Sequence, residues 1–184
     1  MKVLVVYSNE GKVLGGADSA ILRQGEPVFV ADPVENYRSS VALAIRIKRL
    51  GTHIPVRKAL DFVDAFAPVH LLLPAKSGQL PPFFMDRAIS PGQWTPIDEM
   101  PAEMEICVAQ APIPNEPEFL AKSTFSKDSL QIAQTLAALS EQLTFRTGDI
   151  IIFADTATQE TVPRTDFRLT AAINGIPALD IKIK

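Results

Sequence analysis

The chain has few of the residues from which disulfides and zinc sites are built. Its 184 residues include one cysteine, Cys107, and two histidines, His53 and His70. A single cysteine excludes an internal disulfide and leaves no set of thiolates for a structural zinc site, which is typical of proteins from a reducing compartment. We therefore expect a cytoplasmic protein without a cysteine-based metal centre.

Long apolar runs are also missing from the sequence. None approaches the ~20 residues that a membrane-crossing helix needs. The N-terminal run Met1–Tyr7 is too short for the apolar core of a signal peptide, and no small-residue cleavage site follows it. We interpret this run as a strand and expect no interaction with a membrane.

Neither sign of charge dominates, because 18 Lys and Arg face 21 Asp and Glu for a net charge of -3. Such a chain lacks the positive footprint of a nucleic-acid-binding protein, so we expect no nucleic-acid partner. The hydrophobic fraction of 47% and the charged fraction of 21% are typical of globular proteins. No repeat or change in composition marks a boundary, and the length predicts a single domain over residues 1–184.

The distribution of proline predicts a strand-rich fold. The 15 prolines lie between short apolar runs, a pattern that favours many short strands over a helical bundle. The dipeptide Asn174-Gly175 predicts a hairpin, because both residues tolerate the positive φ of a type I′ turn. The expected strands are Lys2–Tyr7, Val28–Ala31, Ala42–Lys48, Val69–Leu73, Met104–Ala109, Asp149–Ala154, Phe167–Ile173 and Ile176–Ile183.

Two helices are expected between these strands. The first follows Pro55, and its apolar face is formed by Val56, Ala59, Leu60, Val63 and Phe66. The second follows Ser126 as its N-cap and carries an apolar face from Leu130 to Leu143. The glycine-rich segment 11–16 lacks the spacing of a phosphate-binding loop, so we expect a plain turn there.

Four sequence blocks occur in a recognisable order. They cover residues 18–28, 41–63, 92–101 and 124–151, and in the last block the pair Leu139-Ser140 leads to the turn Gly148-Asp149 and an apolar strand. Together these blocks resemble the fumarylacetoacetate hydrolase family, and the match extends over about residues 17 to 184. The resemblance implies that residues 1–16 form a shortened version of the family's N-terminal strand and loop.

The resemblance implies an α+β, mostly β fold, with mixed sheets rolled into a distorted barrel and two principal helices. Members of the family are usually dimeric, and they hydrolyse, decarboxylate or isomerise 2-oxo acid-type substrates at a magnesium or manganese ion. Such an ion needs oxygen ligands and polarises the substrate as a Lewis acid. The carboxylate ligands are therefore the positions to examine.

The metal-ligand positions that the resemblance implies have lost their carboxylates. Two glutamates of the family fall on Arg38 and Ser40, and an aspartate falls on Leu71. The family's active-site lysine falls on Phe83, although Asp86 keeps its identity. A fixed positive charge at Arg38 repels a dication, so neither magnesium nor manganese is expected to bind there.

Several other positions carry polar or reactive side chains. The family's Thr-Gly-Thr-Pro turn reads Phe153-Ala154-Asp155-Thr156. We interpret His53 and His70 as lone surface or core residues, and Cys107 as a sheet residue rather than a nucleophile. The pair Glu103 and Glu105 is expected on a solvated strand face. A solvated edge is also the favoured interpretation of a basic cluster made of Arg46, Lys48, Arg49, Arg57 and Lys58.

Three functional hypotheses follow. We favour a catalytically inactive relative of the family with a structural or regulatory role, acting as a homodimer or as a heterodimer with an active paralogue. One alternative is a metal-independent module that binds a small organic acid through Arg38, with Ser40, Asp86 and Asp155 as further contacts. The other is an active hydrolase or decarboxylase with a rebuilt site that uses Asp86, Asp155 or His70.

Overall fold

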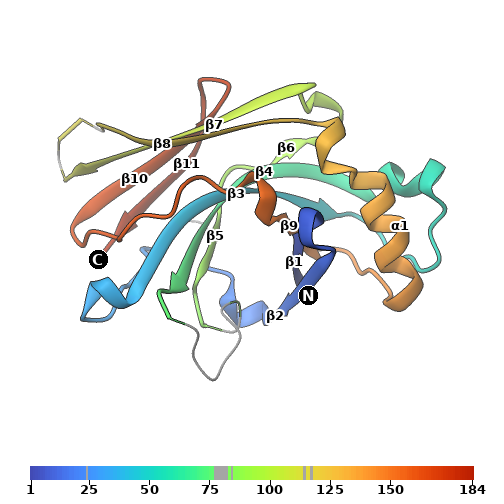
Figure 1. The fold of residues 1–184 in the computed structure, drawn as a ribbon, viewed down its shortest axis with the longest axis horizontal. Coiled ribbons are helices and arrows are strands. Elements are labelled where there is room, and N and C mark those ends of the chain that lie inside the picture. Colours follow the sequence, from blue (N-terminus) through green and yellow to red (C-terminus); the bar gives the residue numbers. More distant parts are fainter. Residues whose placement is uncertain (24, 77–82, 84, 114, 117) are drawn as a thin grey trace.

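The described residues form two sheets and one α-helix (Figure 1). The computed structural model describes residues 1–184 except 24, 77–82, 84, 114 and 117. Within the described part, the sheets stay separate and do not close into a barrel. The α+β, mostly β class that the sequence predicts is confirmed, with mixed strand directions in the larger sheet.

The larger sheet has seven strands in the order β2-β1-β9-β3-β4-β5, with β6 paired to β4. Strand β1 pairs in parallel with β9, and all other pairs in this sheet are antiparallel. The strands are β1 (Val3–Tyr7), β2 (Lys12–Gly16), β3 (Tyr37–Ile47), β4 (Val63–Pro74), β5 (Ile89–Pro91), β6 (Thr95–Pro96) and β9 (Ile150–Phe153).

The smaller sheet is antiparallel, with the order β11-β10-β7-β8. Its strands are β7 (Glu103–Pro112), β8 (Glu118–Ser126), β10 (Phe167–Ile173) and β11 (Ile176–Ile183). The hairpin between β10 and β11 turns at Asn174 and Gly175, whose φ angles are 49° and 79°. Both residues are in the left-handed region, so the predicted type of turn is confirmed.

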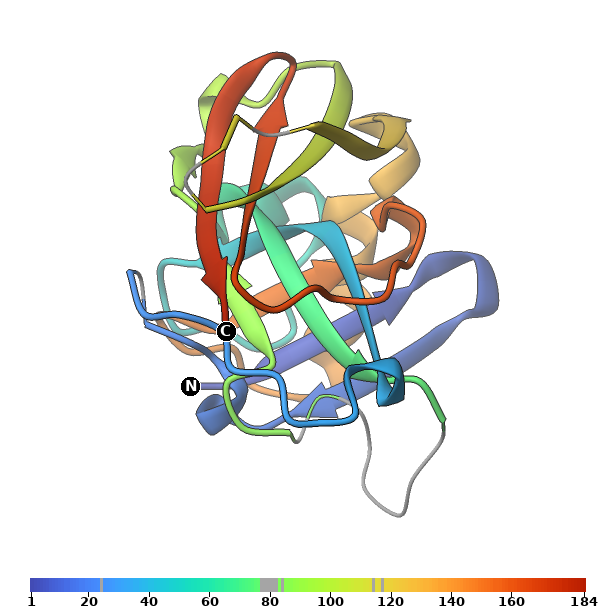
Figure 2. The ribbon, with the colours of Figure 1, turned by 90° about the vertical axis from the view of Figure 1, so that its left-hand side faces the viewer.

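The long strands β3 and β4 are buried on both faces, which explains their nearly continuous apolar sequence. One apolar cluster combines residues of both sheets, including Leu43, Leu72 and Leu179. A second cluster lies on the opposite face of β3 and β4 and includes Ala42 and Leu71. Figures 1 and 2 show the smaller sheet packed across one side of β3 and β4, away from β1 and β2.

The helices differ from expectation. The first is a 3-10 helix of seven residues, Val56–Phe62, and the segment from Val63 onward already belongs to β4. A strand forms there because residues from Val63 onward pair with β3, and β-branched and aromatic residues suit that pleated surface. Apolar spacing alone therefore gave the wrong element for residues 63–66.

The second helix, α1 (Ile132–Gln142), begins later than predicted. Ser126 ends β8, and its hydroxyl accepts a hydrogen bond from the Ser129 backbone N–H at 3.2 Å, so it stabilises a short 3-10 turn instead of capping α1. Ser140 on α1 accepts a hydrogen bond from the Ile54 N–H at 2.7 Å. The hydroxyl of the Leu-Ser pair thus ties α1 to the segment before the 3-10 helix.

Several strand assignments need correction, and the short strands β5 and β6 were not among the expected ones. Residues Lys12–Gly16 form β2, paired with β1, rather than a plain turn. Strand β8 was missed because its apolar residues Phe119, Leu120 and Ala121 are consecutive, where a bulge shifts the register with β7, so the sequence does not alternate. The expected strand from Val28 makes only an isolated bridge to Ile183.

Asp149 fixes the N-terminal strand to the rest of the sheet. Its fully buried carboxylate accepts hydrogen bonds from the backbone N–H groups of Lys2 at 2.7 Å and Arg146 at 2.8 Å. The Lys2 ammonium also lies 2.8 Å from this carboxylate. These contacts hold β1 in register with β9. Within the described residues, no helix has the length and apolarity needed to cross a membrane.

Candidate functional site

Strands β3 and β4 bring together Arg38, Ser40 and Leu71. These are the positions at which the family resemblance implies metal ligands, and they are called the inherited positions below. Ser40 lies directly opposite Leu71 in the antiparallel pairing, and Arg38 lies opposite Leu73. Because alternate residues share a face, all of these positions face the same side of the sheet. The structure therefore groups the positions that the sequence alignment selected, although the side chains there are not ligands.

The second apolar cluster fills this side of the sheet. Leu71 is 2% exposed and Phe83 is 1% exposed, and both belong to that cluster together with Ala42. The backbone packs tightly here too, since a Cβ on Gly16 would lie 2.7 Å from the Phe83 carbonyl oxygen. Hydrocarbon occupies the positions at which the family resemblance implies an aspartate and a lysine.

Arg38 is directed toward its own chain. Its Nη1 donates hydrogen bonds to the carbonyl oxygens of Glu35 at 3.0 Å and Tyr37 at 2.8 Å. These contacts attach the guanidinium to the 3-10 turn Val34–Asn36 that precedes β3. They explain a local structural role for this arginine.

The residues at the inherited positions do not fit a divalent cation. They offer a guanidinium, one hydroxyl and one aliphatic side chain, whereas magnesium and manganese prefer carboxylate and other hard oxygen ligands. Across the described part of the chain, no three His, Cys, Asp or Glu side chains are grouped to hold a metal. No chemical step can be derived through a metal at Arg38, Ser40 and Leu71.

The two aspartates of the candidate ligand site lie apart from Arg38. Asp86 is exposed in the turn before β5. Asp155 accepts hydrogen bonds from the backbone N–H groups of Ser8 at 2.6 Å and Asn9 at 3.4 Å, so its carboxylate stabilises the turn after β1. No hydrogen bond or ion pair between described residues joins either aspartate to Arg38.

Two arginines of the basic cluster, Arg46 and Arg49, have partners. Arg46 makes a bidentate contact with Asp64, at 3.1 and 2.7 Å, and its guanidinium lies 4.9 Å from the ring centre of Trp94. Arg49 lies 4.2 Å from the ring centre of Phe62. Charge pairing and stacking explain the positions of both guanidinium groups without an anionic ligand.

Cys107 is held as a thiol. Its Sγ donates to the Glu105 carboxylate at 3.1 Å, and Lys122 lies 3.3 Å from the same carboxylate. The hydrogen bond to Glu105 and partial burial raise the pKa of Cys107, while the same hydrogen bond lowers the pKa of Glu105. A protonated thiol beside a carboxylate is a poor nucleophile.

His70 is the polar residue whose surroundings the sequence did not reveal. It is fully buried on β4, and its Nε2 lies 2.8 Å from the Ser39 hydroxyl on β3. Burial lowers the pKa of His70 to about 4, so the imidazole is neutral at pH 7. Ser39 is 31 residues away in the chain, and only the pairing of β3 with β4 brings the two together.

Comparison with known proteins gives matches among solved structures. No protein-family profile matches the chain, and no curated protein matches it. Fumarylpyruvate hydrolase from Pseudomonas aeruginosa, in complex with Mn2+ and pyruvate, is 16% identical, with a TM-score of 0.75 over 100% of this chain and 89% of that one.

Two further structures agree with this result. Maleylpyruvate hydrolase from Sphingobium sp. SYK-6 is 18% identical, with a TM-score of 0.76 over 99% of this chain and 69% of that one. A protein of Yersinia pestis CO92 that is assigned to the fumarylacetoacetate hydrolase family is 16% identical, with a TM-score of 0.78 over 100% of this chain and 92% of that one. The chain has the fold of the fumarylacetoacetate hydrolase family.

Proposed function

We propose that this chain is a non-catalytic relative of the hydrolases and isomerases that share its fold. It uses neither magnesium nor manganese at the inherited position, and it has a structural or regulatory role through pairing with itself or with an active homologue. One observation carries the proposal. Leu71 and Phe83 are buried in one apolar cluster where the family resemblance implies a metal-binding aspartate and a lysine.

The chemistry of the similar enzymes supports this proposal. The Pseudomonas aeruginosa hydrolase is seen with Mn2+ and pyruvate. A metal in such a site polarises an oxygen of the substrate, which protein side chains achieve only with preorganised charge or hydrogen-bond donors. Leucine and phenylalanine supply neither. The fold is retained because the apolar clusters stabilise it without the ion.

A metal-binding measurement tests the proposal. Chelator-treated protein is heated with and without Mg2+ or Mn2+, and the Pseudomonas aeruginosa hydrolase is treated in the same way as a positive control. A ligand that binds only the native state raises the midpoint of unfolding by mass action. We expect a shift for the hydrolase and none for this chain. Stoichiometric metal with a clear shift in this chain would refute the proposal.

Adding pyruvate to the same experiment separates the binding-module alternative. The two backbone contacts of the Arg38 guanidinium favour a structural role for this residue, so we expect no stabilisation by pyruvate. A pyruvate-dependent shift that disappears in Arg38→Ala would establish that a small organic acid binds there instead.

The outer face of the smaller sheet is suited to pairing. Ala109 and Thr170 lie opposite each other at its centre. Ion pairs flank this uncharged strip, with Arg168 bound to Asp180 on one side and Lys122 bound to Glu105 on the other. An uncharged centre with charged side chains at its rim resembles the core and rim of protein interfaces.

The pairing has its own test. Sedimentation equilibrium of the wild type is expected to give the mass of a dimer, and Thr170→Arg at the centre of the strip is expected to give a monomer. Val13→Arg, on the edge strand β2 of the larger sheet, is the control away from this face and is expected to remain dimeric. A monomeric wild type would rule out pairing with itself.

A further inference from the structure

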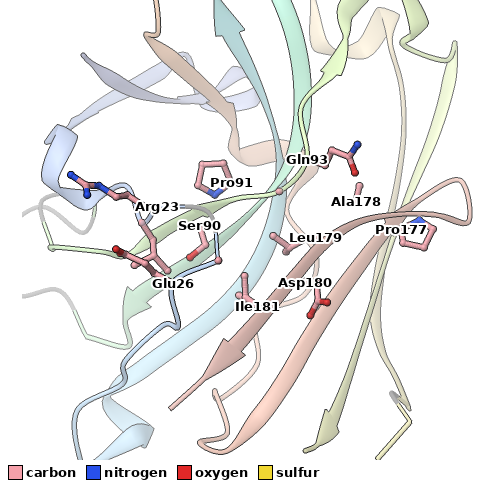
Figure 3. Close-up of a pocket in the computed structure, with 13 residues that line it drawn as sticks. Arg23, Glu26, Ser90, Pro91, Gln93, Pro177, Ala178, Leu179, Asp180 and Ile181 are labelled. Atoms are coloured by element: carbon pink, nitrogen blue, oxygen red, sulfur yellow. The ribbon is translucent and has the colours of Figure 1, made fainter. Parts of the chain in front are cut away.

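Two hollows in the surface differ in the charge of their walls. Arg23, Glu26 and Asp180 all line the pocket between β5 and β11, so both signs of charge meet there (Figure 3). A second hollow, of about 290 Å³, lies between α1 and the hairpin of β1 and β2 (Figure 1). We call it the hairpin groove, and its lining is mainly uncharged, with Val6, Tyr7, Val13, Thr135, Ala138 and Leu139.

The groove is open on the side of β2. Val6 of β1 and Val13 of β2 lie opposite each other, so their side chains share the face of the sheet that α1 covers. Val6 is buried, whereas Val13 is 41% exposed. Gly15 follows on the same face, and a Cβ there would meet no atom within 4 Å. Helix α1 therefore covers β1 but leaves β2 and the space beside it uncovered.

The outer edge of β2 carries backbone groups without a partner strand. The Ile150 N–H donates to the Lys2 carbonyl oxygen, so Lys2 and every second residue after it face β9, and the residues between them face β2. The register of β1 with β2 then turns Val13 and Gly15 away from β1. Strand β2 ends its sheet, and no described residue bonds the backbone of Val13 or Gly15 from that side. This edge can therefore pair with one further strand.

The open edge is bounded at both ends. At one end the Ala17 N–H donates to the Phe83 carbonyl oxygen at 3.2 Å. At the other end the chain turns into β1, and the Gly11 N–H donates to the Ser8 carbonyl oxygen at 3.3 Å. The edge between these bonds is short, so it is suited to a few residues of an extended segment rather than to a whole sheet.

The turn of the hairpin lies in negatively charged surroundings. The pKa of Tyr7 is raised by burial and, to a smaller extent, by nearby carboxylates. These carboxylates belong to Glu10, Glu160 and Asp155. The Lys12 ammonium lies 5.4 Å from the centre of the Tyr7 ring and offsets part of their charge. Three carboxylates against this one ammonium favour a partner that brings a lysine or an arginine.

We propose that β2 and the hairpin groove bind an extended basic segment of a partner protein by strand addition. The backbone of the segment pairs with Val13 and Gly15, and one of its apolar side chains packs against Val13, Ala138 and Leu139. A lysine or arginine of the segment lies beside the hairpin turn. In this mode of recognition the main-chain hydrogen bonds supply affinity, and the groove and the charge select the sequence.

The test uses two synthetic peptides, acetyl-KVTVK-amide and its acidic counterpart acetyl-EVTVE-amide, as probes of the full chain. Amide chemical shifts of 15N-labelled protein are followed during titration with each peptide. Saturable shifts are expected at Val13, Gly15 and Ala138 with the basic peptide, and much smaller ones with the acidic peptide. Two N-methylated forms of the basic peptide test the strand pairing. Because successive N–H groups of a strand point in opposite directions, methylation of the threonine nitrogen and methylation of both valine nitrogens should weaken binding to very different extents.

Variants of the protein test the groove. Val13→Arg places a bulkier, positively charged side chain at the groove and should weaken binding of the basic peptide at least about tenfold. Ile176→Arg introduces the same charge at an exposed position near the tip of the hairpin of β10 and β11, so it is the matched control and should bind as the wild type does.

Four results would each overturn the proposal. The first is the absence of shifts at Val13 and Gly15 with the basic peptide. The second is equal or tighter binding of the acidic peptide. The third is equal affinity of the two N-methylated peptides, which is measured on the wild type and needs no variant to fold. The fourth is unchanged affinity in a folded Val13→Arg. None of these results depends on whether the inherited positions bind a metal.

Discussion

Replacing Leu71 with aspartate restores the carboxylate that the family resemblance implies, and it distinguishes a filled core from an empty metal site. Leu71 is 2% exposed within the second apolar cluster. Removing most of a buried leucine side chain costs about 2–5 kcal/mol, and burying an unpaired carboxylate adds several more. Leu71→Asp should therefore lose at least about 5 kcal/mol, comparable with the whole stability of many domains.

Leu73→Asp is the matched control for this change. Leu73 lies two residues along the same strand, is only partly buried and faces Arg38 in the register of β3 and β4. An aspartate there gains a cationic neighbour and keeps contact with water, so a loss of no more than about 1 kcal/mol is expected. The two variants introduce the same charge on the same face of β4.

Urea unfolding provides the measurement. Trp94 is the single tryptophan and packs against the second apolar cluster, so its fluorescence reports directly on that region. With a urea dependence of about 2 kcal/mol per molar, Leu71→Asp should lower the midpoint by at least about 2.5 M or leave the chain unfolded. Lowering the pH should restore part of the loss, because burial raises the pKa of the new carboxyl. Equal midpoints for the two variants, or stabilisation of Leu71→Asp by Mn2+, would refute the reasoning.

Three further predictions concern stability. Asp149→Ala should lose about 3 kcal/mol in thermal unfolding, because two backbone N–H groups lose their acceptor, and Asp149→Asn should lose less; equal losses would contradict this account. The pKa of His70 is about 4 in the folded chain and 6.5 as a free side chain. The stability of the fold that depends on neutral His70 is therefore complete above about pH 6.5 and is lost as the pH falls toward 4. The wild type should lose about 3 kcal/mol more than His70→Gln between pH 7 and pH 4 in urea unfolding, whereas His53→Asn should keep the wild-type dependence; a parallel pH profile for His70→Gln would show that this histidine is not the cause. Gly92→Ala should cost about 1–3 kcal/mol because its methyl group collides with a backbone carbonyl, whereas Gly15→Ala meets no atom within 4 Å and should be nearly neutral by calorimetry.

Short sequence motifs correctly predicted those structural elements that a few neighbouring residues determine. Asn174-Gly175 specified its hairpin because the turn needs two residues that tolerate positive φ. Residues 63–66 were assigned wrongly because their apolar spacing suits either a helix or a strand buried on both faces, and pairing with β3 decides between them.

The candidate site also has features that the sequence revealed and features that it did not. The family resemblance alone selected Ser40 and Leu71, two positions that the fold places opposite each other. The proximity of Ser39, His70 and Ser90 could not be predicted in this way, because these residues are isolated in the sequence and no common motif joins them. Their proximity depends on the registers of β3 with β4 and of β4 with β5.

The parallel pairing of β1 with β9 constrains the order in which the chain can fold. Val3 pairs with Ile150, so this contact closes a loop of nearly the whole chain, whereas β3 and β4 pair across a short connection. Contacts between distant residues form slowly, because the entropy of loop closure is lost before the contact stabilises anything. During synthesis, β1 and β2 emerge first but must wait for β9, and the inner edge of β1 stays open until then. Strand β9 therefore joins β1 to β3 late in synthesis, and until it does the unpaired edge of β1 can pair with other chains.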